Sequence, residues 1–156
     1  MKKFYCFLFL TCLIVGCGNN KGGDSASAGN LNEEIEEVYD FFVSMHTTSP
    51  KNAAESWCDK HSSWNSESNG RDGYCVTTEN SRAFVRMIIM KHSFYLASVG
   101  GSSHDAVCQT LRDLFGEPYR TETLHDAEYS EWKTSKGVEV AVEKDGILSS
   151  IAFASR

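Results

Sequence analysis

The sequence is poor in basic residues, and this limits the classes of partner it suits. Its 156 residues contain 15 Lys and Arg against 21 Asp and Glu, which gives a formal net charge of −6 at pH 7. A surface of this sign is a poor match for nucleic acid or for anionic lipid headgroups. It suits a basic protein partner, although many soluble domains carry such a charge with no partner implied.

Motifs of common catalytic and cofactor sites are also missing. The five histidines are scattered, and there is no H-E-x-x-H, no G-x-S-x-G, no phosphate-binding glycine loop and no recognisable carboxylate pair. His104 and Cys108 lie one helical turn apart and could form a thiolate–imidazole pair. However, Cys108 falls in a hydrophobic row, where a thiol is usually inert. We therefore expect no enzyme activity, no cofactor and no metal.

Apolar runs of membrane-spanning length are absent as well. The run over residues 4–15 has twelve residues, interrupted only by Thr11, whereas a spanning helix needs about 20. Lys2 and Lys3 precede the run, which is typical of a secretory signal peptide. We expect residues 1–16 to be removed, and the loss of the two lysines changes the formal net charge to −8.

The segment Leu13-Ile14-Val15-Gly16-Cys17 resembles the lipobox of bacterial lipoproteins, which signal peptidase II cleaves before the cysteine. The resemblance implies an acylated (palmitate-bearing) Cys17 and an anchor in the bacterial cell envelope, since two or more acyl chains hold a protein stably. Gly18 stands where many inner-membrane lipoproteins have Asp, so we expect the outer membrane, facing the periplasm. Residues 18–30 are small and polar, which predicts a tether with a reach of roughly 20 Å.

Residues 31–156 are expected to form a single domain that begins with helices. Apolar residues at steps of three and four predict a helix over residues 32–46, and Ser49-Pro50 offers an N-cap for a shorter helix that ends near residue 61. Residues 62–73 are predicted to be a polar loop. The apolar residues between 79 and 98 predict a central helix, although their β-branched and aromatic content also permits a strand over residues 84–90.

The last third of the sequence changes from helical to strand periodicity. Ser102 and Asp105 begin a third helix, which Gly116 and Pro118 close. A period of two then predicts four strands, at residues 119–124, 129–134, 138–143 and 147–154. The expected fold class is α+β, with N-terminal helices packed on one face of a C-terminal antiparallel β-meander. The alternative is an NTF2-like cone, in which helices precede a curved sheet.

The C-terminal part also resembles a known family. The residues that carry the resemblance are Gly101, Ser103, Val107, Leu111, Gly116, Pro118, Trp132, Val140, Gly146 and Ile151. Over residues 101–154 they are similar to the pattern of the outer-membrane assembly lipoproteins SmpA/OmlA (BamE) and of β-lactamase-inhibitor-like domains. The resemblance implies a helix packed on an antiparallel sheet. It implies no chemistry, because the pattern marks a capped helix, its exit and a sheet.

Two cysteines and three aromatic residues near the predicted loop are the remaining candidates. Cys58 and Cys75 frame that loop, so in an oxidising compartment a disulfide between them is expected. A metal site that uses Cys58, His61 and Cys75 is the competing interpretation, and pairing of Cys108 with either of these cysteines stays open. The aromatic residues best placed to contact a partner are Trp57, Trp64 and Tyr74, with packing beneath the loop as their alternative role.

Two functional hypotheses follow from the sequence. The first is an accessory or adaptor lipoprotein of an outer-membrane or periplasmic assembly, which acts by binding protein. The second is a periplasmic inhibitor or immunity protein that presents its acidic surface to a basic hydrolase. An adaptor should need the anchor at Cys17, whereas an inhibitor should survive the loss of its anchor. Neither hypothesis involves nucleic acid.

Overall fold

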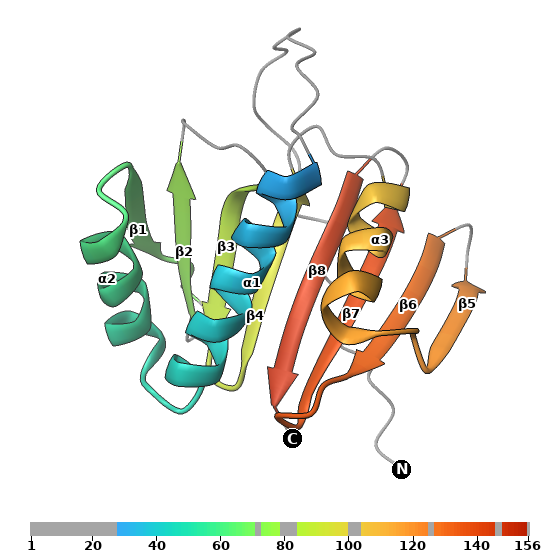
Figure 1. The fold of residues 1–156 in the computed structure, drawn as a ribbon. Helices are drawn as coiled ribbons and strands as arrows, with labels where there is room; N and C mark the ends of the chain where they lie inside the picture. The colour runs from blue at the N-terminus through green and yellow to red at the C-terminus, as the bar shows by residue number, and fades with distance from the viewer. Residues whose placement is uncertain are drawn as a thin grey trace, which may run out of the picture.

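The computed structural model describes residues 28–70, 73–78, 84–99, 104–124, 127–145 and 148–155. These residues form three helices and one eight-stranded antiparallel sheet, which confirms the α+β class (Figure 1). The elements in chain order are α1 (Ala28–Met45), α2 (Pro50–Lys60), β1 (Trp64–Ser68), β2 (Gly73–Thr78), β3 (Phe84–Met90), β4 (Ser93–Val99), α3 (His104–Phe115), β5 (Arg120–Leu124), β6 (Ala127–Lys133), β7 (Val138–Asp145) and β8 (Leu148–Ser155). The predicted signal peptide, Cys17 and most of the predicted tether lie outside the described residues.

The sheet consists of two successive meanders that meet at their last strands. Its strand order is β1-β2-β3-β4-β8-β7-β6-β5, so β1–β4 form one half and β5–β8 the other. Each meander directly follows a helix, α2 in the first half and α3 in the second. The halves join where β4 pairs with β8, with Phe94 opposite Phe153 and Tyr95 opposite Ala152.

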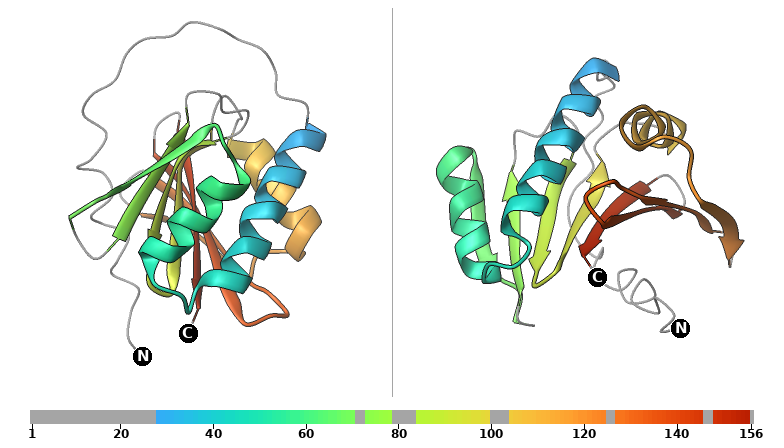
Figure 2. Two further views of the ribbon diagram at one scale, coloured as in Figure 1. Left: turned by 90° about the vertical axis from the view of Figure 1, so that its left-hand side faces the viewer. Right: turned by 60° about the horizontal axis from the view of Figure 1, so that its bottom comes forward.

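All three helices lie on the same face of this sheet, as the two views in Figure 2 show. The strand residues that point toward the helices are apolar and fully buried, because alternate side chains of a strand point to opposite faces. They include Met87, Ile89, Phe94, Leu96, Trp132, Val140, Val142, Ile151 and Phe153, each at most 1% exposed. Within the part of the chain that the structure describes, no helix covers the other face and none is long and apolar enough to cross a membrane.

Helix α1 packs over β4 and β8, the two strands at which the halves of the sheet meet. The Phe42 ring lies 5.0 Å from the Phe94 ring of β4 and 6.1 Å from the Phe153 ring of β8, measured between centroids. Tyr39, one turn earlier, lies 6.0 Å from Phe153 and 4.8 Å from Phe115 at the end of α3. The apolar stripe of α1 therefore bridges both meanders and the third helix.

Helix α2 begins where the sequence predicts it. Ser49 is its N-cap, in an extended conformation, and its hydroxyl accepts a hydrogen bond from the Asn52 backbone N–H at 3.3 Å. Pro50 occupies the first turn, where its missing N–H has no helical partner to lose. The cap thus fixes the start of the helix and directs Trp57 into the core, where it is 2% exposed.

The largest correction concerns residues 62–98. The predicted loop contains strand β1, and the predicted central helix is the β3–β4 hairpin, which turns at Lys91 and His92. In β3, Met87 and Ile89 point to the helices, whereas Ile88 and Met90 point to the opposite face. Because both faces of this hairpin carry apolar side chains, the alternation that marks a strand is hidden in the sequence.

The C-terminal prediction is confirmed. Helix α3 ends at Phe115, Gly116 follows it with a left-handed φ of 81°, and the four predicted strands are β5 to β8. The predicted capping residue Ser102 and the turn residue Gly146 lie outside the described residues. The meander is therefore present as expected, but it is only half of the sheet.

Candidate functional site

One face of the sheet has no helix of the described residues packed on it, and we call it the uncovered face. One row of cross-strand neighbours crosses all eight strands on this face, with the pairing given by the register. In order from β1 to β5 its residues are Glu67, Cys75, Ile88, Tyr95, Ala152, Ala141, Glu131 and Arg120. Small residues therefore occupy the centre of the face, and larger side chains flank it on both sides.

The two halves of this face differ in chemistry. In the β2–β4 half, Ile88, Met90 and Tyr95 are half-buried and leave part of their apolar surface open. In the β5–β7 half the same face carries four carboxylates, on Glu122, Glu131, Glu139 and Glu143, against the two cations of Arg120 and Lys133. The face thus combines a half with an apolar and aromatic patch, beside Arg86, with a half rich in carboxylates, of which Glu143 is buried.

Tyrosine hydroxyls order the acidic half. Tyr119 donates to Glu131 Oε2 at 2.8 Å, and Tyr129 donates to Glu143 Oε1 at 2.9 Å. Desolvation, followed by this hydrogen bond and by the charge of Glu131, raises the pKa of Tyr119 to about 12. The Tyr119 phenol therefore keeps its proton and remains a donor at every physiological pH.

The aromatic residues predicted to contact a partner lie on the helix side of the sheet, on α2, β1 and β2. Trp57 is 2% exposed, and its ring lies 4.0 Å from the His61 ring, 5.0 Å from Phe41 and 5.8 Å from Trp64. Trp57 is therefore a core residue, which corrects its assignment as a surface contact. Trp64 and Tyr74 are half-buried and pack against the same core.

The predicted disulfide between Cys58 and Cys75 is not formed. Both are free thiols, as is Cys108, the third cysteine in the described part of the chain. Cys58 interacts with Ser66 on the helix side of β1, whereas Cys75 points to the uncovered face beside Arg86 and Glu67. Strand alternation therefore places the sheet between the two sulfurs. The same separation removes the alternative Cys58–His61–Cys75 metal site, and the described residues hold no other cluster of three such ligands.

His104 and Cys108 do come together, at the start of α3. Cys108 Sγ lies 3.3 Å from His104 Nε2, and His104 Nδ1 lies 3.1 Å from Ser149 Oγ on β8. Burial raises the pKa of the Cys108 thiol and lowers the pKa of His104. Both groups are thus held neutral, and a neutral buried thiol is a weak nucleophile. The geometry is that of a structural hydrogen-bonded cluster that ties α3 to β8.

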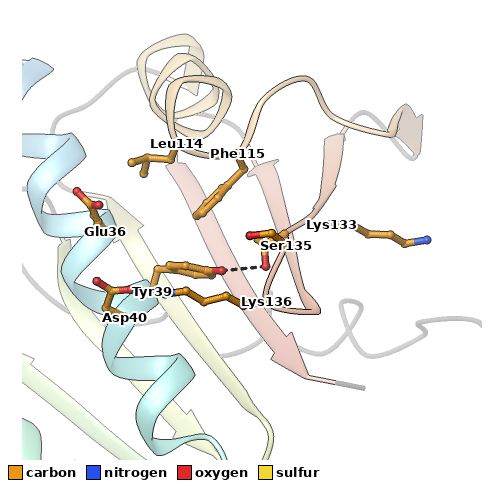
Figure 3. A pocket seen from close by; sticks show the side chains of 9 residues that line it. Glu36, Tyr39, Asp40, Leu114, Phe115, Lys133, Ser135 and Lys136 are labelled. Carbon is orange, nitrogen blue, oxygen red and sulfur yellow. Dashed lines mark hydrogen bonds and ion pairs between the residues drawn. The ribbon is translucent and has the colours of Figure 1, made fainter.

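A cleft of about 380 Å³ opens between α1, the end of α3 and the β6–β7 turn (Figure 3). Tyr39 and Phe115 form its floor, with ring centroids 4.8 Å apart. Tyr39 donates a hydrogen bond to Thr134 Oγ1 at 2.8 Å, which fixes the ring. Asp40 of α1 and Lys136 of the turn form an ion pair of 3.0 Å at its edge.

No family model matches this chain, and neither the curated proteins nor the solved structures that were searched contain a match. Sequence reasoning missed both the uncovered face and the cleft, because each combines residues that are far apart in the chain. The one local signal was the second apolar row, of which the helix prediction placed Ile88 and Tyr95 in the core.

Proposed function

We propose that this protein is a lipid-anchored protein of the bacterial cell envelope that binds another protein through the uncovered face of its sheet. In this proposal it serves as an accessory or adaptor lipoprotein of an outer-membrane or periplasmic assembly, held by an acylated Cys17. The observation that carries the proposal is the partly exposed apolar row Ile88, Met90 and Tyr95, on a sheet face that no helix of the described residues covers. Clustered apolar side chains on an open face are typical of an interaction surface.

The size of the face supports a protein partner. Eight strands spaced about 4.8 Å apart span roughly 34 Å, and strands of five to eight residues are about 17–26 Å long. The face therefore offers roughly 600–900 Å², close to the approximately 800 Å² that one partner contributes to a standard protein interface. A small molecule would use only a fraction of this surface.

The second candidate function is an inhibitor or immunity protein against a basic hydrolase, and the acidic half of the face favours it. Glu122 and Glu131 are partly exposed and each has a defined partner, so their positions are fixed before binding. Such preorganised carboxylates suit a basic surface and speed its association. Adaptor and inhibitor differ in what binding does to the partner, and in whether the anchor is needed.

A site-specific photo-crosslinker tests the proposal in cells. We would place a benzophenone side chain at Tyr95 on the uncovered face, and at the exposed Lys51 of α2 as the matched control. The expected result is one crosslinked protein from position 95 and none from position 51. Equal crosslinking from both positions, or none from position 95, would contradict a partner on the sheet.

The Cys17→Ala variant then separates the two roles. An adaptor works beside the membrane, so loss of the lipid should abolish its function while the crosslink from position 95 weakens. An inhibitor should keep its effect, because a soluble copy still occupies its target. Lack of any change in the membrane fraction of the variant would refute acylation at Cys17.

A further inference from the structure

The cleft between α1 and the β6–β7 turn lies apart from the sheet face, and its charges are unequal. Its α1 wall carries the carboxylates of Glu36 and Asp40, one helical turn apart and both exposed. Lys136 is the one ammonium directed into it, because the Lys133 ammonium points away and lies 4.5 Å from the Tyr119 ring centroid (Figure 3). Glu36 makes no ion pair or hydrogen bond within the described residues.

Lys136 shows how a cation fits this cleft. Its Nζ lies 3.0 Å from Asp40 Oδ1 and 5.3 Å from the centroid of the Tyr39 ring. A carboxylate and an aromatic face therefore act on the same ammonium, which is the arrangement that binds cations well. The lysine belongs to the turn between β6 and β7, and its side chain is 51% exposed.

The contact that holds Lys136 is easily exchanged. Exposed ion pairs are weak because water competes with both partners, so a second cation can displace this ammonium. The binding site beneath it stays in place, since Tyr39 is fixed by Thr134 and packs on Phe115. Leu114 and Phe115 add an apolar wall for the methylene groups of a longer side chain.

We propose that this cleft binds an arginine side chain of a protein partner, and that Lys136 occupies the position of the guanidinium in the free protein. The planar guanidinium can stack on the Tyr39 ring and offers five N–H donors in a fixed plane to the two carboxylates, against the three donors of an ammonium. This second contact is independent of the uncovered sheet face. It explains the excess of carboxylate in the cleft through charge complementarity with a basic partner.

The test is a ¹H–¹⁵N correlation titration of the full-length chain with N-acetyl-arginine N-methylamide. The matching citrulline compound has the same shape without the charge. We expect the arginine compound to shift the amide signals of Tyr39, Asp40 and Lys136 saturably, and the citrulline compound to leave them unchanged. Equal shifts with both compounds would overturn the proposal.

Substitution of the two lysines and of Asp40 tests whether Lys136 occupies the binding site. Lys136→Met removes the competing ammonium and should tighten binding about two- to fivefold, whereas Asp40→Asn should weaken it by at least the same factor. Lys133→Met is the matched control and should bind like the unchanged chain, because the Lys133 ammonium lies outside the cleft. If Lys136→Met binds no more tightly than Lys133→Met, Lys136 does not occupy the site and the proposal is wrong.

Discussion

Removal of the Phe42 ring should destabilise both halves of the sheet together. The ring is fully buried and contacts Phe94 at 5.0 Å and Phe153 at 6.1 Å, on the two strands that join the halves. Truncation of a buried Phe to Ala costs about 3–5 kcal/mol. At about 3–4 °C per kcal/mol for a domain of this size, Phe42→Ala should lower the Tm by about 10–20 °C.

The assay is urea unfolding of the full chain, followed by tryptophan fluorescence and by far-UV circular dichroism. Trp57 lies in the first half and Trp132 in the second, so one cooperative transition reports on both. Phe42→Leu should lose about 1 kcal/mol, and Glu33→Ala, exposed on the same helix, should stay within about 0.5 kcal/mol. If Phe42→Ala lowered the free energy of unfolding by less than 1 kcal/mol, α1 would not hold the two halves of the sheet together.

Three further predictions concern single groups. The folded pKa of Tyr119 is raised to about 12 from 10, so its contribution to stability is complete below pH 10 and is lost between pH 10 and 12. Ultraviolet titration at 295 nm should show one phenol that ionises at a higher pH than the others, and Tyr119→Phe should remove it. Burial lowers the folded pKa of His104 below 6.5, so the free energy of unfolding should fall as pH drops below 6.5. In thermal unfolding at acidic pH, His104→Asn should make the free energy of unfolding depend less on pH. Because Cys58 and Cys75 are free thiols on opposite faces, the Tm of the unchanged chain should be equal with and without reductant; a reductant-dependent Tm that Cys58→Ser removes would contradict this placement.

The sequence predicted an element well wherever only one of its faces is apolar. Helix α2 has a Ser cap, a following Pro and one buried stripe, and strands β6 and β7 alternate apolar and charged residues, as in Val138, Glu139 and Val140. In each case the hydrophobic period equals the geometric period of the element. The boundaries then follow to within a few residues.

The β3–β4 hairpin was missed because its two faces are both apolar. Met87 and Ile89 pack beneath the helices while Ile88, Met90 and Tyr95 line the uncovered face, so the run has no polar alternation and resembles a buried helix. The feature that misled the prediction is therefore the one on which the proposed interaction surface rests. An apolar strand face without a covering layer departs from the pattern of a simple two-layer domain, and such departures often mark functional surfaces.

The β6–β7 hairpin links the two proposed contacts, and two of its lysines show how they can be studied separately. Lys133 ends β6 on the uncovered face, where its ammonium lies 4.5 Å from the Tyr119 ring centroid. Lys136 follows three residues later, beyond the end of the strand, and its ammonium lies in the cleft beside Asp40. Residues so close in sequence serve different surfaces because the turn reverses the chain between them. A partner that used both surfaces would have to contact this hairpin from two sides, and it should respond to Lys133→Met and Lys136→Met additively. A partner confined to the sheet face should respond to the first substitution alone.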